Sequence, residues 1–298
     1  MFRLSTFDLG RGPVVGITRD GDFFASATFS SMRDVLDQWH LAEEKFATAD
    51  ARMALRTPEK GAILLAPLPN PRNIYIAGAN YTDHVEEMRR LFPDGGAKAN
   101  RGDPWFMLKS TSSVVGPGAS VELPKGVQQL DWEVELAIIM GKPARNVPVE
   151  QALSCVAGYT VANDLSARDR MIRPQEKESS FFRLDWLGHK SFDGACPMGP
   201  TITPASVIKD VQNLEIQLWV NDELMQHSNT RNMVFSVAEL IAHLSAKITL
   251  LPGDVILSGT PAGVGAGCGR FLRAGDHVRQ RVQGIGEFEF TIAPARND

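Results

Sequence analysis

The sequence predicts an α+β protein built from a small N-terminal α/β domain, residues 1–68, and a larger domain, residues 69–298. Segments with the two-residue alternation of strands occur together with segments whose apolar residues recur at helical spacing. The run Ala66–Arg72 contains three prolines, which neither a helix interior nor a central strand accommodates. The chain has 298 residues, 43% of them hydrophobic, which is enough for a substantial core.

Composition narrows the class of protein before any motif is considered. The formal net charge of −4 gives no basic excess for nucleic acid, and no apolar run approaches the roughly 18 residues of a membrane span. The N-terminus lacks the long apolar core of a signal peptide. We therefore expect a cytoplasmic protein without nucleic-acid or membrane partners. The chain has three cysteines, Cys155, Cys196 and Cys268, which are scattered along the sequence. This arrangement fits reduced thiols better than disulfides or a zinc site.

The N-terminal domain is predicted to contain a hairpin followed by a helix. Residues 14–18 and 23–27 suit two strands, and Asp20-Gly21 between them favours a tight turn. Apolar residues then recur at helical spacing, at Met32, Val35, Leu36, Trp39 and Ala42. Nothing in this domain indicates catalysis.

The larger domain opens with a short strand, residues 73–78, and a helix for which Thr82 or Asp83 is available as the N-cap. His84 and Glu87 share one face of this helix. There the carboxylate can hold the imidazole in one tautomer and leave its other nitrogen free to take a proton from water. A lone His-x-x-Glu is more often a surface pair, so only its context favours the catalytic interpretation.

A loop and a buried strand follow that helix. Residues 92–103 are rich in Gly, Asp and Asn, which predicts a loop, and residues 105–109 are predicted to form a buried strand. Lys109 ends this strand. It either binds an anionic substrate or extends its ammonium group to solvent.

An acidic strand suggests a metal site. Side chains alternate over residues 131–140, so one face carries Asp131, Glu133 and Glu135 and then becomes apolar. The backbones of Glu133 and Glu135 are roughly 6.5 Å apart, a distance that two Glu side chains can span to meet one cation. Carboxylates this close repel each other, and a hard divalent ion relieves that repulsion.

A second apolar strand is predicted to end at Asn163-Asp164, and side chains at strand ends often form active sites. Arg168 follows, either as a capping or surface residue or as an anion-binding residue beside a metal. Residues 170–189 are polar and charged and could form a lid. Lys190 after them is a further candidate for anion binding, with solvent exposure as the alternative.

The last third of the chain supplies more strands and one helix. A strand over residues 214–220 runs into a turn at Asn221-Asp222, and Ser236–Glu239 is a capping box that opens a helix. Residues 252–267 combine a turn, a buried strand and a glycine-rich loop, which is not a P-loop because no Gly-Lys-Ser/Thr ends it. Its N–H groups and the Thr260 hydroxyl could cradle a carboxylate.

The closing hairpin shows how weak an isolated Glu-x-Glu pattern is. Glu287 and Glu289 repeat it on a predicted strand, but the facing strand offers Arg279 and Arg281 as partners, so we expect a structural role there. The acidic strand over residues 131–140 has no such cation nearby in sequence.

Taken together, these motifs resemble the fumarylacetoacetate hydrolase family over residues 72–290. The resemblance implies a mixed, barrel-like β-roll with flanking helices, usually dimeric, so that a homodimer binding one Mg²⁺ or Mn²⁺ per subunit is expected. Its specificity comes from an ordered set of motifs, namely Gly78–Glu87, Asp131–Leu136, Gly158–Asp169, Lys190–Asp193 and Gly253–Gly265.

The resemblance also implies roles for individual residues. The metal ligands are expected to be Glu133, Glu135 and Asp164. The catalytic residues, which include a water-activating dyad and a lysine, are expected to be His84, Glu87 and Lys190. The substrate contacts are expected to be Lys109, Arg168, Thr260 and Tyr81. Two departures concern the substrate: Met171 stands where members acting on small acylpyruvates commonly have Gln, and the interval from Arg168 to Lys190 is longer than in compact members.

The predicted reaction is hydrolytic C–C cleavage of an acylpyruvate, such as fumarylpyruvate or maleylpyruvate, to pyruvate and a carboxylic acid. The expected partner is thus a small 2-oxo acid. Two alternatives use the same enolate without water: decarboxylation of oxaloacetate and isomerisation of an oxo-diene acid. A third alternative is a non-catalytic binding protein of the same fold. Such a protein is expected to have degraded metal ligands or to lack the base, and the sequence shows neither.

Overall fold

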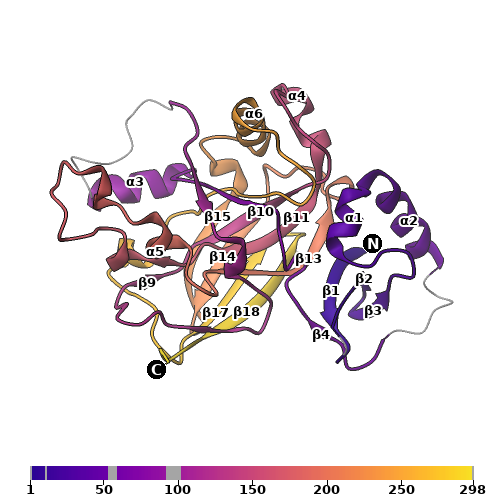
Figure 1. The fold of residues 1–298 in the computed structure, drawn as a ribbon, viewed down its shortest axis with the longest axis horizontal. Coiled ribbons are helices and arrows are strands. Elements are labelled where there is room, and N and C mark those ends of the chain that lie inside the picture. Colours follow the sequence, from indigo (N-terminus) through magenta and orange to yellow (C-terminus); the bar gives the residue numbers. More distant parts are fainter. Residues whose placement is uncertain (1, 11, 53–58, 92–101, 297–298) are drawn as a thin grey trace.

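The computed structural model describes residues 2–10, 12–52, 59–91 and 102–296. It is a mixed α+β structure in which helices flank two main sheets, as Figure 1 shows. Most of the loop predicted over residues 92–103 lies outside the described residues. None of the described helices is long and apolar enough to cross a membrane.

The N-terminal domain, indigo in Figure 1, is a small sheet with two helices packed beside it. The predicted hairpin is confirmed, because two of its strands pair antiparallel around Asp20 and Gly21, whose φ angles of 51° and 87° suit a type I′ turn. Its elements are β1 (Arg3–Asp8), β2 (Pro13–Arg19), β3 (Asp22–Ala25), α1 (Met32–Asp37), α2 (Trp39–Arg52) and β4 (Ile63–Leu64).

The single helix predicted after the hairpin is in fact two. Gln38 leaves the helical region, with φ −117° and ψ 31°, and ends α1. Its carbonyl then accepts hydrogen bonds from the N–H groups of Leu41 and Ala42, which start α2. The apolar spacing continues across this break, so the sequence pattern alone does not reveal it.

The main sheet continues from the N-terminal domain into the larger one. Its strand order is β3-β2-β1-β13-β11-β10-β16-β5-β6, and β1 joins β13 at the pair Leu4 and Ile202. The larger domain contributes β5 (Ile74–Ala77), β6 (Phe106–Lys109), β7 (Val114–Val115), β10 (Val134–Met140), β11 (Val156–Asn163), β13 (Cys196–Pro204) and β16 (Val255–Leu257).

A second sheet of order β15-β14-β17-β18-β8 packs against the main sheet. The described strands form an open roll and do not close into a barrel, because β3 and β6 end one sheet and β15 and β8 end the other. The second sheet consists of β8 (Ser120–Glu122), β14 (Glu215–Val220), β15 (Glu223–Asn229), β17 (His277–Val282) and β18 (Gly286–Ala293).

Strand β10 runs through the core, with every residue buried. Its alternation is as predicted: Val134, Leu136 and Ile138 join the core shared with the second sheet, whereas Ala137 and Ile139 join the core shared with the N-terminal domain. A short pair, β9 (Leu130–Asp131) and β12 (Ser166–Ala167), lies at the end of β10 where the acidic residues occur.

Both helices predicted in the larger domain are confirmed. The Ser236 hydroxyl accepts from the Glu239 N–H while the Glu239 carboxylate accepts from the Ser236 N–H, which is the predicted capping box. The helices are α3 (Thr82–Leu91), α4 (Val149–Ala152), α5 (Trp186–Lys190), α6 (Val237–Lys247) and α7 (Gly265–Cys268). Single-turn 3₁₀ segments are Thr111–Ser113, Leu153–Cys155, Arg168–Arg170, Phe181–Arg183, Ala205–Val207 and Thr230–Asn232.

Candidate active site

Three buried carboxylates meet where β10 begins and β11 ends. The two strands pair antiparallel with Glu135 opposite Ala162, which brings Asp164, just after β11, next to Glu133 and Glu135. One oxygen atom from each of the three carboxylates lies within 4.8 Å of the others. The structure therefore brings the three predicted metal ligands together.

The donor set fits a hard divalent cation. Burial raises the pKa of Glu135 well above its usual range, and the negative charges of Asp164 and Glu133 raise it further. Within the described part of the chain, Glu135 forms no ion pair, although Gly259 N–H donates a hydrogen bond of 2.6 Å to its Oε2. Carboxylate oxygens are preferred ligands of Mg²⁺ and Mn²⁺, so bound metal would relieve this repulsion.

Lysine and arginine side chains from distant segments surround the same carboxylates. Lys190 Nζ donates to Glu133 Oε2 at 2.9 Å and to Asp164 Oδ2 at 2.6 Å. Lys109 Nζ lies 2.7 Å from Asp164 Oδ1 and donates to the Lys190 carbonyl. Both lysines are buried, so solvent exposure, the alternative for each, is wrong.

Arg168 joins the cluster from its other side. Its Nη2 donates to Glu133 Oε1 at 2.5 Å and its Nε to Asp131 Oδ2 at 2.8 Å. Burial opposes ionisation of Glu133, but the charges of Lys190 and Arg168 outweigh it and lower its pKa to about 2. With Asp131 included, four carboxylates face three cations, which leaves one formal negative charge for a metal to balance.

The predicted dyad forms on the first turns of α3. His84 Nδ1 lies 2.9 Å from Glu87 Oε2, and His84 is only 8% exposed, so this is not a surface pair. The protonated imidazole would lower the pKa of Glu133, so the ring is within electrostatic range of the cluster. Glu87 Oε1 also accepts from the Gly263 N–H at 2.9 Å, which fixes the carboxylate that orients the ring.

The other predicted substrate contacts, Thr260 and Tyr81, are both buried. Thr260 Oγ1 donates to the Val134 carbonyl at 2.9 Å and accepts from Gln226 Nε2 at 2.8 Å. Tyr81 is fully buried, and burial, followed by the charge of Glu135, raises the pKa of its hydroxyl. In this arrangement Thr260 supports β10, the strand that carries Glu135.

Sequence reasoning gave no role to several residues that shape the site. Asp131 binds Arg168 and two N–H groups of the glycine-rich loop, and Asn163 Oδ1 accepts from the Glu133 N–H at 3.0 Å. Ser166 Oγ donates to Glu133 Oε1 at 3.2 Å. Asp131 and Asn163 did carry a signal, the first by its place on the acidic face of the strand and the second by its place at the predicted end of the next strand.

The Glu-x-Glu of the closing hairpin has the structural role that was predicted. Glu287 Oε1 lies 3.1 Å from Arg279 Nη1, as expected, whereas Glu289 Oε2 pairs with His277 Nε2 at 3.0 Å and not with an arginine. All four side chains are at least 30% exposed, unlike the buried carboxylates of the candidate site.

Comparisons with known proteins agree with this geometry. The family model described as "Fumarylacetoacetate (FAA) hydrolase C-terminal" matches residues 73–293. A protein of Xenopus laevis named "Oxaloacetate tautomerase fahd2, mitochondrial" is 43% identical over 225 residues, which are 75% of this chain and 66% of that protein. The chain spans just under two thirds of the length of that relative. The name of the relative places it in mitochondria, whereas the cytoplasmic location expected for this chain stays a prediction.

Solved structures resemble the whole chain. Maleylpyruvate hydrolase from Sphingobium sp. SYK-6, solved in complex with manganese(II) ion and pyruvate, has a TM-score of 0.77 and 30% identity, covering 99% of this chain and 100% of that chain. The 2-hydroxyhepta-2,4-diene-1,7-dioate isomerase from Mycobacterium marinum has a TM-score of 0.71 and 28% identity, and covers 100% of both chains.

Proposed function

The chain belongs to the fumarylacetoacetate hydrolase family, and on that premise we propose that it is a divalent-metal-dependent enzyme that hydrolyses a C–C bond of an acylpyruvate. The observation that carries this proposal is the buried His84–Glu87 pair beside the carboxylate cluster. A base oriented in this way is what activation of a water molecule requires.

Glu133, Glu135 and Asp164 would hold the metal. When bound, it supplies a Lewis acid for the negative charge that develops on a 2-oxo acid. Lys190 and Arg168 lower the pKa of Glu133, and their positive charges, with that of Lys109, can offset the charge of an oxyanion nearby. The site thus combines acidic ligands with a cationic surround, which suits an anionic substrate.

The dyad supplies the proton transfers. Glu87 accepts a hydrogen bond from Nδ1–H of His84, so Nε2 keeps its lone pair and takes a proton from water. The resulting hydroxide adds to the 4-carbonyl of the acylpyruvate. The C3–C4 bond then breaks with its electron pair moving to C3, and C3 takes up a proton to give pyruvate, while the acyl group leaves as a carboxylic acid.

Tautomerisation of oxaloacetate is the second candidate. The observation that favours it is the 43% identity with the frog protein named oxaloacetate tautomerase, against 30% with the maleylpyruvate hydrolase structure. Here the same base would take a proton from C3, breaking a C–H bond, and the 2-oxo oxygen would gain a proton, and no carbon–carbon bond would break.

A product assay separates the candidates. The purified chain is supplied with Mn²⁺ and offered maleylpyruvate, fumarylpyruvate and oxaloacetate, and products are identified by NMR. Pyruvate together with a second carboxylic acid supports the hydrolase. Faster keto–enol exchange of oxaloacetate without cleavage of any acylpyruvate would replace it with the tautomerase, and CO₂ release would indicate a decarboxylase.

The dyad is tested by His84→Gln. Because a positioned base contributes roughly 10²–10⁴-fold, turnover should fall by about that factor while Mn²⁺ binding is kept. The exposed His227, whose Nε2 pairs with Glu215 at 2.9 Å, provides the control, and His227→Gln should retain activity. Wild-type turnover by His84→Gln would mean that the dyad is not the base.

A further inference from the structure

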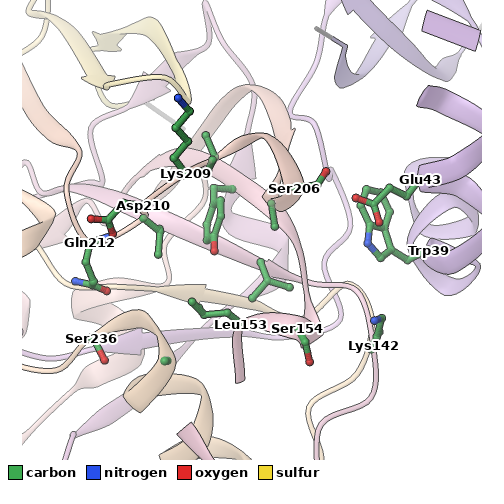
Figure 2. Close-up of a pocket in the computed structure, with 16 residues that line it drawn as sticks. Trp39, Glu43, Lys142, Leu153, Ser154, Ser206, Lys209, Asp210, Gln212 and Ser236 are labelled. Carbon is green, nitrogen blue, oxygen red and sulfur yellow. The ribbon is translucent and has the colours of Figure 1, made fainter. Parts of the chain in front are cut away.

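A cavity of about 550 Å³ opens between the N-terminal domain and the larger domain. Figure 2 shows Trp39 and Glu43, from α2, across the cavity from Lys209, Asp210 and Gln212. None of the residues that line it belongs to the candidate active site. Its volume is typical of small-molecule sites, which measure roughly 300–1,000 Å³.

Two buried donors line this cavity without using their hydrogen-bonding capacity. Trp39 and Tyr159 are each only 3% exposed, yet no hydrogen bond within the described residues involves the Trp39 indole nitrogen or the Tyr159 hydroxyl. Burial raises the pKa of Tyr159, so its hydroxyl stays protonated and able to donate. Both polar atoms remain accessible from the cavity, so an acceptor from outside the chain can reach them.

The remaining lining indicates what kind of molecule fits. The walls expose more apolar than polar surface, and the charged residues around them are balanced in sign, so an uncharged ligand is favoured over an ion. The apolar lining residues are Leu153, Val156, Ala205, Ile208, Val211 and Ala238. The charged ones are Glu43, Lys142, Lys209 and Asp210.

We propose that this cavity is a second binding site, for a mostly apolar, uncharged ring compound whose oxygen atoms accept hydrogen bonds from Trp39 and Tyr159. The proposal is independent of the reaction at the carboxylate cluster. Such a ligand would contact both domains at once, because Trp39 lies on α2 and Tyr159 on β11.

Indole NMR of the full chain tests this directly, with coumarin as the probe because it is neutral, planar and carries two acceptor oxygens. The chain has five tryptophans, and the Trp39 N–H signal is the one that disappears in Trp39→Phe. Coumarin should shift the Trp39 indole proton downfield and saturate with a Kd near ~1 mM, while the other four signals stay in place.

Matched variants and a matched probe decide the outcome. Tyr159→Phe removes one donor and should weaken coumarin binding several-fold, whereas Tyr75→Phe, outside the cavity lining, should not. Indene, which has the ring shape but no oxygen, should bind more weakly than coumarin. No saturable shift of the Trp39 signal, or equal Kd values for Tyr159→Phe and the wild type, would overturn the proposal.

Discussion

Asp131 holds parts of the candidate active site together, although it is not one of the predicted metal ligands. The residue is fully buried, its Oδ1 accepts from the Gly265 N–H at 2.5 Å, and its Oδ2 accepts from the Ala266 N–H at 3.0 Å and from Arg168 Nε. It therefore connects the glycine-rich loop that holds Glu87 with the arginine that binds Glu133.

Asp131→Asn should reduce both stability and turnover. An amide nitrogen cannot accept the hydrogen bonds that a carboxylate oxygen accepts, and Arg168 loses a counter-charge. We expect a loss of about 1–3 kcal/mol in the free energy of unfolding, measured with urea, and a lower kcat/KM. Asp169→Asn is the control, because Asp169 is exposed and accepts from the Gln128 N–H at 2.6 Å. Equal losses in both variants would contradict the role given to Asp131.

The lowered pKa of His189 predicts that the folded protein loses stability in mild acid. Burial first, and then the charges of Lys190 and Arg168, lower the pKa of His189 to about 3 from an ordinary value near 6.5. The folded protein therefore excludes a proton that the unfolded chain binds below about pH 6.5. The stability that the folded state gains from the neutral His189 is therefore fully present above about pH 6.5 and is lost as the pH falls towards 3.

His189→Asn removes the titrating group and can still offer an N–H to the Ala167 carbonyl, which lies 3.0 Å from His189 Nδ1. Between pH 7 and pH 5 its free energy of unfolding should fall by about 2 kcal/mol less than that of the wild type. Urea unfolding at the two pH values measures the difference, and equal falls would show that His189 does not titrate in this way.

At the level of residues, the sequence predicted the carboxylates better than their partners. Glu133 and Glu135 share a strand face, and strand periodicity is local, so their proximity could be predicted. Lys190 lies 57 residues from Glu133 in sequence, and its ion pair depends on how α5 packs against β12 and β6. No local pattern carries that information.

At the level of elements, the glycine-rich loop after β16 acts as a support for α3. An added Cβ at Gly267 would lie 2.1 Å from Glu87 Oε1, so Gly267→Ala must displace the carboxylate that orients His84. We expect kcat to fall by about 10-fold or more, part of the 10²–10⁴-fold that a positioned base contributes. Steady-state kinetics with Mn²⁺ measures it.

Gly269→Ala, at the residue that ends α7, separates this effect from general strain. Gly269 has φ +69°, so alanine is disfavoured there and should destabilise the fold by about 1 kcal/mol, but no heavy atom lies within 4 Å of the added Cβ. Its kcat should remain near that of the wild type. If both variants lost activity equally, direct displacement of Glu87 would not be the cause.

Elements with a clear period were predicted, and those without one were missed. The strand over β10, the capping box of α6 and the β2–β3 hairpin all follow local rules. In β1, by contrast, Leu4–Phe7 are buried in succession between β2 and β13, so no alternation marks the strand.

At the level of the whole molecule, the two predicted domains share one sheet. The proline-rich run Ala66–Arg72, where the domain boundary was predicted, lies between β4 and β5. Yet β1 pairs with β13, and Val35, Trp39 and Ile139 belong to one hydrophobic core. Local sequence marks where the chain passes from one part to the other, whereas strand pairing across about 200 residues depends on tertiary packing.

At the scale of the whole chain, the proposed metal site depends on Glu133, Glu135 and Asp164 holding one divalent ion where β10 begins and β11 ends. Calorimetric titration with Mn²⁺ tests it most directly, with Glu135→Ala compared against Glu287→Ala, the matching change in the exposed Glu-x-Glu strand. We expect one ion per chain for the wild type and for Glu287→Ala, and loss of binding for Glu135→Ala. Unchanged stoichiometry and affinity in a folded Glu135→Ala variant would contradict it.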